Sequence, residues 1–460
     1  MHFDRMFWKS VLRIAIPVTI QQFITSFLNL VDVMMVGQLG DTAVAGVGLA
    51  NQVVFLLTFF LFGTNSGSAS LTAQLWGKKD LTNIRRVLIL CLLITGFGGA
   101  LFFTIAHFFP NQTMSFYSSD SKVIELGSRY LQINSIGYLM MAVSWSFSSI
   151  LKSTGVVKPQ MLISLAALGL KTILNFLLIF GNLGFPKMGT DGAALATVVA
   201  RSIELAAMLY IVYFHYPVVA IFPSHFNGFK KGLVKLYLKT ALPVTGNEIL
   251  WGAGISAYNF IYAHISTHAV AAYDIVSSVE NVAYVIFVGL SDACGILVGN
   301  KIGASKEKEA FRDAKKLLVV IIILALLMGV VIYFSREMIM SLYNVEEITR
   351  QYAIGFLLVS SCMLWIRSSL IIIIIGIFRA GGDTRFSFAI DAGSIWLIGV
   401  PMAAIGAFIW HLPPPTVYLL ATAEEIIKLI ICLIRVFSGK WIHNLADNVQ
   451  SISIEESISG

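Results

Sequence analysis

Long apolar segments, separated by short polar ones, run through the whole chain. Leu88–Phe109 and Leu317–Phe334 are two examples, and each is almost unbroken apolar sequence. A helix needs about 20 such residues to cross the hydrocarbon core of a bilayer, and the segments lack the alternation of a membrane β-barrel. The pattern predicts an all-α integral membrane protein with twelve transmembrane helices, over residues 11–36, 47–75, 87–110, 122–151, 159–181, 190–214, 236–264, 270–299, 314–334, 350–378, 386–410 and 416–437.

The composition supports a membrane protein without a metal or disulfide framework. Hydrophobic residues make up 57% of the chain and charged residues only 12%, whereas soluble domains are about 25% charged. The N-terminus begins like a signal peptide, but its apolar stretch continues to about Val36 without a cleavage site, so we expect a retained first helix. The four cysteines are scattered through apolar segments without the spacing of metal ligands. We therefore expect no structural metal and no cofactor.

The Lys and Arg residues indicate the orientation in the membrane. They concentrate in the N-terminal segment and in every second loop, and the intervening loops hold few of them. Because loops rich in Lys and Arg face the cytoplasm, we expect a multi-pass protein of the cell membrane with both termini cytoplasmic. The net charge of +7 is then a signal of topology and not a nucleic-acid-binding surface. The basic loops include Lys78, Lys79, Lys152, Lys158, Lys231, Lys235, Lys301, Arg379 and Arg385.

The two halves of the chain resemble each other. A shift of 226 residues aligns Leu12–Asp80 with Leu238–Lys306 without a gap, and Pro17 then meets Pro243, each followed by Val-Thr. Glycines and a basic loop also occupy equivalent positions in the two halves. With one further residue of shift, the segment 152–155 also meets the segment 379–382. The repeat predicts that the protein arose by internal duplication.

Each repeat contains six predicted spans, so both halves enter the membrane in the same direction. This predicts two six-helix lobes related by a pseudo-twofold axis along the membrane normal, with a working site between them. We expect an N-terminal lobe over residues 1–226, a C-terminal lobe over 227–442 and a polar, disordered cytoplasmic tail over 443–460. Such an architecture suits alternating access, although channels and scaffolds can also be duplicated.

Several motifs, in order along the chain, resemble those of the multidrug and toxic compound extrusion (MATE) transporters. They are Ser26–Gly40, Gly46–Gln52, Thr72–Asp80, Leu174–Gly181, Gly184–Pro186, Gly192–Thr197, Leu242–Glu248, Ile296–Asn300 and Arg379–Arg385. The resemblance implies a secondary active antiporter, not an enzyme, that exports amphipathic and often cationic drugs or toxic metabolites. It also implies that sodium ions or protons flow inward in exchange, and the sequence leaves the choice of ion open.

Acidic residues inside the predicted spans are candidates for coupling. A charge in the bilayer centre costs several kcal/mol, so it needs a partner or a purpose. Asp32 lies in an otherwise apolar run and matches the first-helix aspartate to which the family's N-lobe cation site is attributed. Glu248 and Glu280 lie within the seventh and eighth helices with no Lys or Arg three or four residues away. Each could bind a coupling ion or a cationic substrate, or form a structural hydrogen bond.

A lysine near the middle of the fifth helix departs from the family pattern. Several MATE members carry Asn and then Asp at the positions of Lys171 and Asn175, so a sodium site there is in doubt. The Lys171 ammonium is expected to pair with Asp32 or Glu204. We hypothesise that Lys171 releases its carboxylate when that carboxylate is protonated; a fixed structural pair or a snorkelling side chain is the alternative.

Other membrane charges have structural explanations. Arg201 with Glu204, and Glu424 with Lys428, are spaced for pairing within one helix. Asp391 is near the end of its predicted helix, where we expect solvation or capping. Arg367 is expected to snorkel or to pair across the lobes.

Polar and aromatic residues of the predicted spans could line a substrate cavity. For the Trp and Tyr side chains, anchoring at the membrane interface or helix packing is the alternative. The candidates are Gln21, Gln52, Tyr138, Trp145, Asn247, Trp251, Asn259 and Tyr262. We expect small amphipathic substrates, contact with the lipid bilayer, and a monomer.

Two other classes of function compete with export. A membrane-embedded enzyme is disfavoured because the sequence lacks a phosphate-binding glycine loop and the catalytic motifs of hydrolases and metalloproteases. A lipid-linked precursor flippase would share the two-lobed architecture, and it would have a more cationic cavity.

Overall fold

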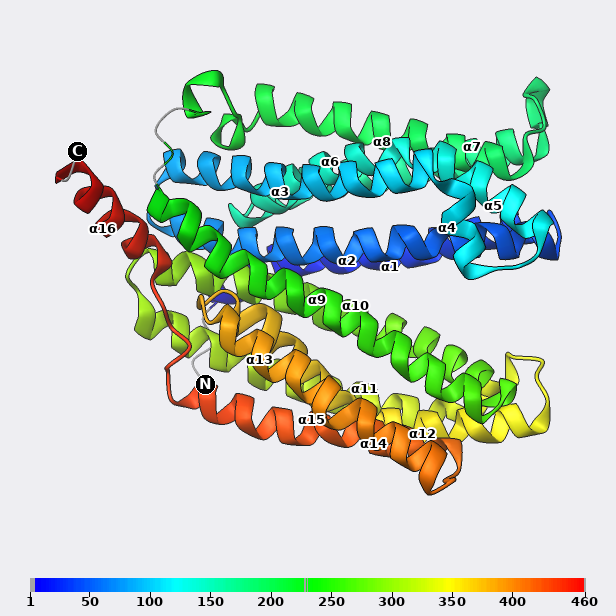
Figure 1. Ribbon diagram of the computed structural model, residues 1–460. Helices are drawn as coiled ribbons and strands as arrows, with labels where there is room; N and C mark the ends of the chain where they lie inside the picture. The colour runs from blue at the N-terminus through cyan, green and yellow to red at the C-terminus, as the bar shows by residue number, and fades with distance from the viewer. Residues whose placement is uncertain (1–4, 227–228, 230, 459–460) are drawn as a thin grey trace. The chain divides into compact units, whose positions relative to one another are not determined.

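The computed structural model describes residues 5–226, 229 and 231–458, and these are helical almost throughout, with no β-strand among them (Figure 1). The first half contains α1 (Arg5–Gly37), α2 (Asp41–Gly77), α3 (Leu81–Phe108), α4 (Pro110–Tyr117), α5 (Ser121–Asn134), α6 (Ile136–Ser153), α7 (Lys158–Phe180) and α8 (Gly189–Phe214). The second contains α9 (Lys231–Ile265), α10 (Thr267–Gly303), α11 (Glu307–Ser341), α12 (Glu347–Ile371), α13 (Thr384–Ser394), α14 (Val400–Ala404), α15 (Pro414–Phe437) and α16 (Leu445–Ile458). Short 3₁₀ segments η1–η3 and π-helical segments η4–η6 connect or extend them.

The expected all-α membrane fold is confirmed. Each predicted span coincides with a helix or with helices in direct succession, and nine helical stretches within the described residues are long and apolar enough to cross a membrane. The chain is therefore a multi-pass membrane protein. Two helices were not predicted: α4, and α16, which occupies most of the segment 443–460 where the sequence predicts a disordered tail. Residues 459 and 460 of that segment lie outside the described part.

The chain forms two compact units, which we call the N-terminal and C-terminal units. The N-terminal unit comprises Ile20–Thr245 and the described part of Val449–Gly460, and the C-terminal unit comprises Gly246–Asn448 and the described part of Met1–Thr19. Both α1 and α9 therefore contribute to both units, and they divide after Thr19 and Thr245, which are equivalent positions of the repeat. The lobe boundary predicted at 226 and 227 falls at a gap in the described residues and stays a prediction.

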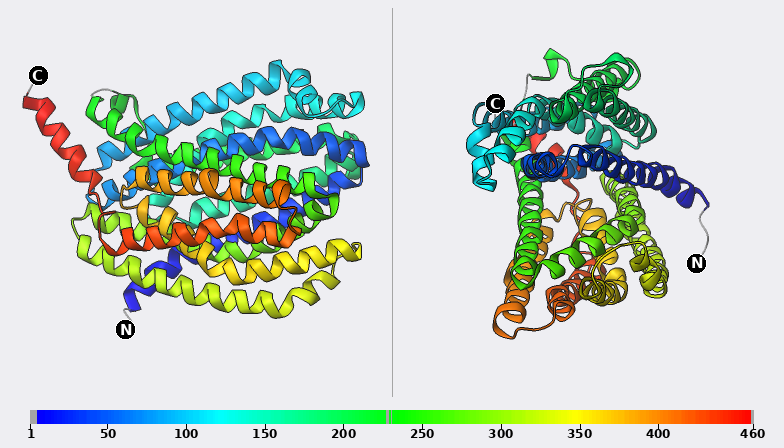
Figure 2. Two further views of the ribbon diagram at one scale, coloured as in Figure 1. Left: turned by 60° about the horizontal axis from the view of Figure 1, so that its bottom comes forward. Right: turned by 90° about the vertical axis from the view of Figure 1, so that its right-hand side faces the viewer.

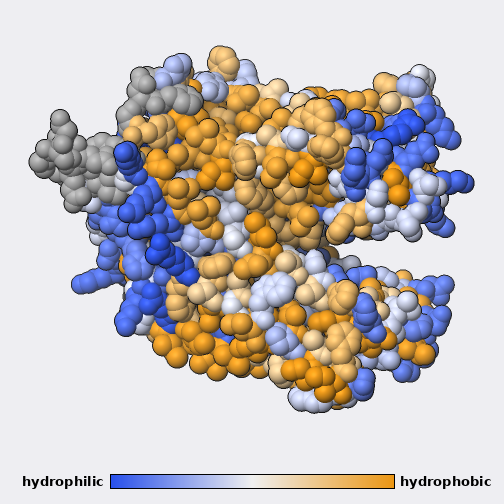
Figure 3. All heavy atoms as spheres, in the orientation of Figure 1, coloured by the Kyte–Doolittle hydropathy of each residue, from blue (hydrophilic) through white to orange (hydrophobic). Residues whose placement is uncertain are grey.

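Within each unit the long helices run side by side as a bundle (Figures 1 and 2). In the N-terminal unit, Leu57 and Leu61 of α2 belong to one hydrophobic core with residues of α5, α6 and α8, and in the C-terminal unit Phe356 and Leu364 of α12 belong to a core with residues of α10 and α15. Large apolar side chains also remain exposed at helical spacing, for example Leu326, Leu327, Val330 and Val331 on α11. On the face shown in Figure 3, such side chains cover the middle of the helices, and hydrophilic residues gather near the ends. This pattern fits a lipid-facing surface.

Two of the predicted membrane spans in the C-terminal unit contain π-helical segments, whose turns are wider than those of an α-helix. The helix α12 continues directly into η4 (Ile372–Phe378), whereas the equivalent residues of the first repeat, 145–151, belong to the ordinary α-helix α6. The eleventh predicted span, 386–410, consists of α13, η5 (Ile395–Gly399), α14 and η6 (Ile405–Ile409) in succession. A π turn accommodates one additional residue within a helix.

A glycine of α10 permits close packing against α1 within the C-terminal unit. A Cβ atom at Gly289 would lie 2.9 Å from the Ala15 carbonyl oxygen and 3.2 Å from the Thr19 amide nitrogen. We expect Gly289→Leu to destabilise the protein by about 1–3 kcal/mol, because backbone atoms cannot move aside easily. Thermal unfolding in detergent measures the effect. Gly48→Leu is the matched control, since Gly48 is exposed and a Cβ atom there would have no neighbouring atom within 4 Å. An equal loss in both variants would contradict the packing explanation.

Candidate functional site

The first candidate, Asp32, lies on α1 in the N-terminal unit and is only 8% exposed. Three residues on one face of α7 surround its carboxylate. The Lys171 Nζ atom is 2.8 Å from Asp32 Oδ2, the Asn175 amide donates to Oδ1 at 2.8 Å, and the Thr172 hydroxyl donates to Oδ1 at 3.4 Å. Of the two partners that the sequence left open for Lys171, the structure therefore shows Asp32.

The other membrane charges of the N-terminal unit form the predicted local pair. Arg201 donates to Glu204 at 2.7 Å, and the Ser164 hydroxyl donates to the other Glu204 oxygen at 3.1 Å. Close by in sequence, Gln160 of α7 donates to Gln21 of α1 at 3.0 Å. Asp32 and Glu204 thus each have one cationic partner.

In the C-terminal unit, Glu248 of α9 accepts a hydrogen bond from the Arg379 guanidinium. Arg379 follows η4 directly and is only 2% exposed. The sequence assigns Arg379 to a basic cytoplasmic loop, and the structure places it in the turn between η4 and α13 with its side chain buried. The motif Arg379–Arg385 marks Arg379 in the sequence. Neither its position nor its spacing identifies Glu248 as the partner of Arg379.

Glu280 of α10 belongs to a larger network. Arg367 of α12 donates to Glu280 at 2.6 Å through Nη1 and contacts both Glu425 oxygens through Nε at 2.8 and 2.9 Å. The hydroxyls of Tyr418 and Ser360 also donate to the same Glu280 oxygen. The expectation that Arg367 snorkels or pairs across lobes is wrong, because its two carboxylates belong to its own unit.

A third group of the C-terminal unit surrounds Lys428 on α15. Its ammonium is 3.1 Å from Asp391 and 3.2 Å from Glu424, and the Asn247 amide donates to the second Asp391 oxygen at 2.9 Å. The predicted pair of Glu424 with Lys428 is confirmed, but it is shared. The expectation of a solvated or capping Asp391 is wrong, because this side chain is buried between α9 and α15.

These groups give the two units different charge balances. In the N-terminal unit the two acids, Asp32 and Glu204, meet two cations. In the C-terminal unit the acids outnumber the cations: Glu248, Glu280, Asp391, Glu424 and Glu425 surround Arg367, Arg379 and Lys428. The described clusters of the C-terminal unit therefore carry a negative formal charge that protons or a bound cation could neutralise.

The substrate-cavity candidates divide by exposure. Gln52, Trp251 and Asn259 are exposed and Trp145 is half-buried, so they remain predicted cavity residues. Tyr138 and Tyr262 lie inside the hydrophobic cores of their units, which supports the packing alternative for both. The buried Asn247 and the half-buried Gln21 donate or accept the hydrogen bonds described above and hold helices together.

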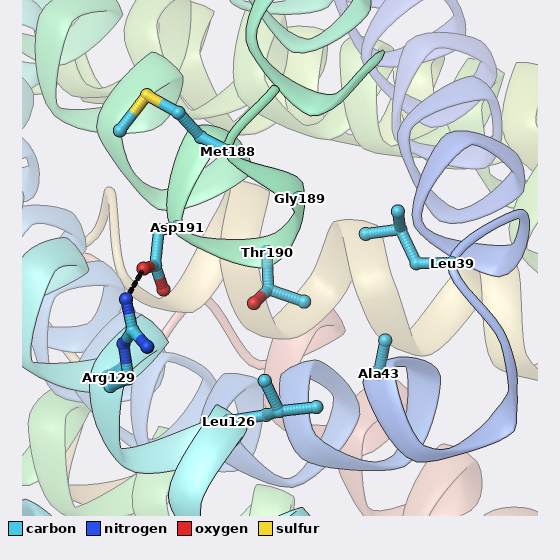
Figure 4. Close-up of a pocket in the computed structure, with 8 residues that line it drawn as sticks. All are labelled: Leu39, Ala43, Leu126, Arg129, Met188, Gly189, Thr190 and Asp191. Carbon is cyan, nitrogen blue, oxygen red and sulfur yellow. Dashed lines mark hydrogen bonds and ion pairs between the residues drawn. The ribbon is translucent and has the colours of Figure 1, made fainter. Parts of the chain in front are cut away.

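A small pocket of about 280 Å³ lies at one end of the N-terminal unit (Figure 4). Leu39, Ala43 and Leu126 form its apolar side, and Arg129 pairs with Asp191 beside it. Of the candidate residues predicted from the sequence, none lines this pocket. Because it is shallow and its only described charges neutralise each other, we do not assign it a role in transport.

Asp383, which precedes α13, is held by two basic groups. Its oxygens are 2.8 Å from Arg435 Nε and 3.7 Å from His443 Nε2. Partial burial by itself raises the pKa of the Asp383 carboxyl, but the hydrogen bonds and charges of His443 and Arg435 outweigh it and lower that pKa below its ordinary value. Ionised Asp383 therefore stabilises the end of α15 and the segment after it.

This lowered pKa predicts an acid-sensitive contribution to stability. The contribution is present above the unfolded-state pKa of about 3.9 and is lost as pH falls through the lower folded-state pKa. We expect Asp383→Asn to unfold at a lower temperature than the unmodified protein at pH 7, with the difference shrinking below about pH 4. Melting temperatures measured from pH 7 to pH 3 test this, and a difference that is unchanged at pH 3 would refute it. Glu125→Gln, an exposed carboxylate, serves as the control.

Comparison with known proteins agrees with this architecture. The MatE family model matches residues 17–177 and 249–405, one range in each half of the chain. The chain is 28% identical over 407 residues to a protein of Bacillus subtilis named "Probable multidrug resistance protein YoeA", with 86% of each chain covered. It is 25% identical over 400 residues to the "Probable multidrug resistance protein NorM" of Bacillus licheniformis, covering 86% of this chain and 88% of the relative.

Solved structures share the fold. A crystal structure of MATE in complex with MaL6 superposes with a TM-score of 0.83 at 18% identity, covering 94% of this chain and 97% of the other. A transporter of the MOP superfamily from Pyrococcus furiosus superposes with a TM-score of 0.84 at 19% identity, covering 94% and 96%. At this identity the likeness establishes the twelve-helix fold and says nothing about individual residues.

Proposed function

The chain belongs to the MatE family of membrane transporters, and on that premise we propose that it is a secondary active efflux antiporter. It exports amphipathic, cationic drugs or toxic metabolites by alternating access, in exchange for an inward flow of protons or sodium ions. Relatives named multidrug resistance proteins support this choice of substrate. The loop charges support cytoplasmic placement of both termini.

The observation that supports coupling best is the group around Asp32. This carboxylate is buried in a membrane helix and held by one ammonium, one amide and one hydroxyl. A proton on Asp32 would remove the attraction to Lys171 and free the ammonium, and loss of that proton would restore the pair. The group can therefore exist in two arrangements that differ by one proton, as coupling requires.

The acids Glu248 and Glu280 are proposed to act on the C-terminal side. Each is bound to an arginine from another helix, so neither is an open metal site in this arrangement. Protonation of either acid, or competition from a cationic substrate, would weaken that ion pair. The surplus of acids in the C-terminal unit favours export of cations over the alternative, a lipid-linked precursor flippase with a cationic cavity.

Transport in everted membrane vesicles tests the proposal. Efflux of a fluorescent amphipathic cation is measured with a pH gradient and a sodium gradient imposed separately, and Asp32→Asn serves as the coupling-deficient variant. We expect one of the two gradients to drive dye movement in the unmodified protein and neither to drive it in the variant. Absence of gradient-driven movement of any amphipathic cation by the unmodified protein would contradict the proposal.

A further inference from the structure

One oxygen of a buried carboxylate on α15 has no hydrogen-bond donor. Glu424 is only 3% exposed, and its Oε1 atom lies 3.2 Å from the Lys428 ammonium. Its Oε2 atom is buried and has no hydrogen-bond partner among the residues that the structure describes. Leaving a buried acceptor without a donor is unfavourable, and more so when the acceptor is ionised. The arrangement therefore calls for a donor at Oε2.

A tyrosine hydroxyl in the same place is also without a partner. Within the described part of the chain, the Tyr258 hydroxyl of α9 is buried and makes no hydrogen bond. Both side chains lie against Gly399: a Cβ atom there would clash with the Tyr258 hydroxyl and would lie 3.1 Å from Glu424 Cγ. The Tyr258 hydroxyl could donate to an ionised Oε2 or accept from a protonated one through a bridging water, because the structure shows no direct hydrogen bond between the two groups. The hydroxyl can therefore serve Glu424 in either protonation state, and the charges around Glu424 decide which state is favoured.

The charges around Lys428 select Glu424 over its neighbour. One ammonium serves two carboxylates, Asp391 and Glu424, at nearly equal distances. Asp391 receives an additional hydrogen bond from the Asn247 amide, whereas Glu424 receives none. If the two carboxylates share one proton, we expect that proton on Glu424, because Asp391 has more hydrogen-bond donors and is better stabilised as an anion.

Among the described residues, the helices packed against α15 offer Glu424 no second cation. On α12 the nearby cation is Arg367, and it is engaged with two other carboxylates. One of these is Glu425, on α15 itself, which adds another negative charge. On α13 the basic residue is Arg385, which is exposed near the start of that helix. The segments η4, η5, α14 and η6, which also pack against α15, contain no titratable residue. In these surroundings a proton is the simplest way to neutralise Glu424.

We propose that Glu424 is an exchangeable proton site of the C-terminal unit, with the Tyr258 hydroxyl as its hydrogen-bonding partner. This deepens the proposed function, on which it rests, by naming a proton-carrying residue of the second half. A proton fits the site better than a sodium ion. The Lys428 ammonium at 3.2 Å repels a metal ion, and one free carboxylate oxygen and one hydroxyl are too few ligands for a hard cation. When the proton leaves, Asp391 and Glu424 share the Lys428 ammonium.

Infrared difference spectroscopy on the purified full-length protein tests the site without any substrate. Spectra at acidic and alkaline pH are subtracted, and the carbonyl stretch of protonated carboxylic acids is compared between the unmodified protein, Glu424→Gln and the control Glu125→Gln. We expect the Glu424→Gln variant to lose one pH-dependent carboxylic acid band that the control retains. An unchanged set of bands in Glu424→Gln overturns the proposal.

Tyr258→Phe provides a second variant that keeps all the charges. It removes the hydroxyl, so we expect the same band to persist at a shifted frequency, and an unshifted band overturns the role of Tyr258. If Glu424→Gln does not fold, a shifted band in Tyr258→Phe identifies Glu424 as its source, and an unshifted band overturns the proposal. Dye efflux is measured in parallel: if the unmodified protein moves no dye under any gradient, the proposed function fails, whereas the infrared result for Glu424 stands separately.

Discussion

Replacing Arg379 by alanine is expected to destabilise the protein by about 3–5 kcal/mol, the largest effect that we predict for a single substitution. Arg379 is almost completely buried, and its guanidinium binds the buried Glu248 carboxylate. Removing one partner leaves an uncompensated charge in a low-dielectric interior, and this costs more than the pair itself contributes. We expect poor yield in detergent and a large fall in melting temperature.

A matched control comes from an ion pair at the surface. Arg350 lies 3.3 Å from Glu337 with both side chains substantially exposed, so Arg350→Ala should cost only about 0–1 kcal/mol. The double variant Arg379→Ala with Glu248→Gln removes the stranded charge and should recover part of the lost stability. If the double variant were no more stable than Arg379→Ala alone, the explanation by an unpaired Glu248 charge would be wrong.

Lys171→Ala is expected to abolish efflux driven by an ion gradient. The substitution leaves Asp32 with the Asn175 amide and the Thr172 hydroxyl as its remaining partners. We expect a stability loss of about 3 kcal/mol, at the low end for a broken buried pair, because the Lys171 side chain is 24% exposed. Efflux driven separately by pH and sodium gradients, together with melting temperatures, measures both effects.

Neutralising the partner provides the control for Lys171. In Asp32→Asn with Lys171→Ala, neither a free carboxylate nor a free ammonium remains, so stability should recover while coupling stays lost. Lys171→Arg keeps the charge and should retain part of the transport. Full coupled transport by Lys171→Ala, with unchanged ion dependence, would show that the pair is structural only.

The membrane helices were predictable because their signal is local. An apolar run of about 20 residues identifies a span wherever it stands, and pairs such as Arg201 with Glu204 follow from the geometry of one helix. The partners of Glu248 and Glu280 could not be predicted in this way. Arg379 and Arg367 are 131 and 87 residues away, and only the packing of different helices brings them together.

Asp391 shows why the position of a residue within its helix can mislead. Its place near a helix end predicts solvation, yet α9 and α15 cover it and supply Asn247 and Lys428. The sequence identified Lys171 as an unusual residue and offered two partners for it. The orientation of α7 relative to α1 determines that Asp32 is the partner of Lys171. No local sequence pattern encodes that orientation.

The π-helical turn η4 explains how the two halves of the gene could diverge in length. The repeats align with a shift of 226 residues up to Lys306 and of 227 at Arg379, and η4 ends immediately before Arg379. An extra residue inserted into an α-helix turns everything after it by about 100°, which would aim Arg379 away from Glu248. A wide turn absorbs the insertion locally and preserves the direction of the residues beyond it. The segment η4 therefore provides a place within a membrane helix where one additional residue leaves the direction of Arg379 unchanged.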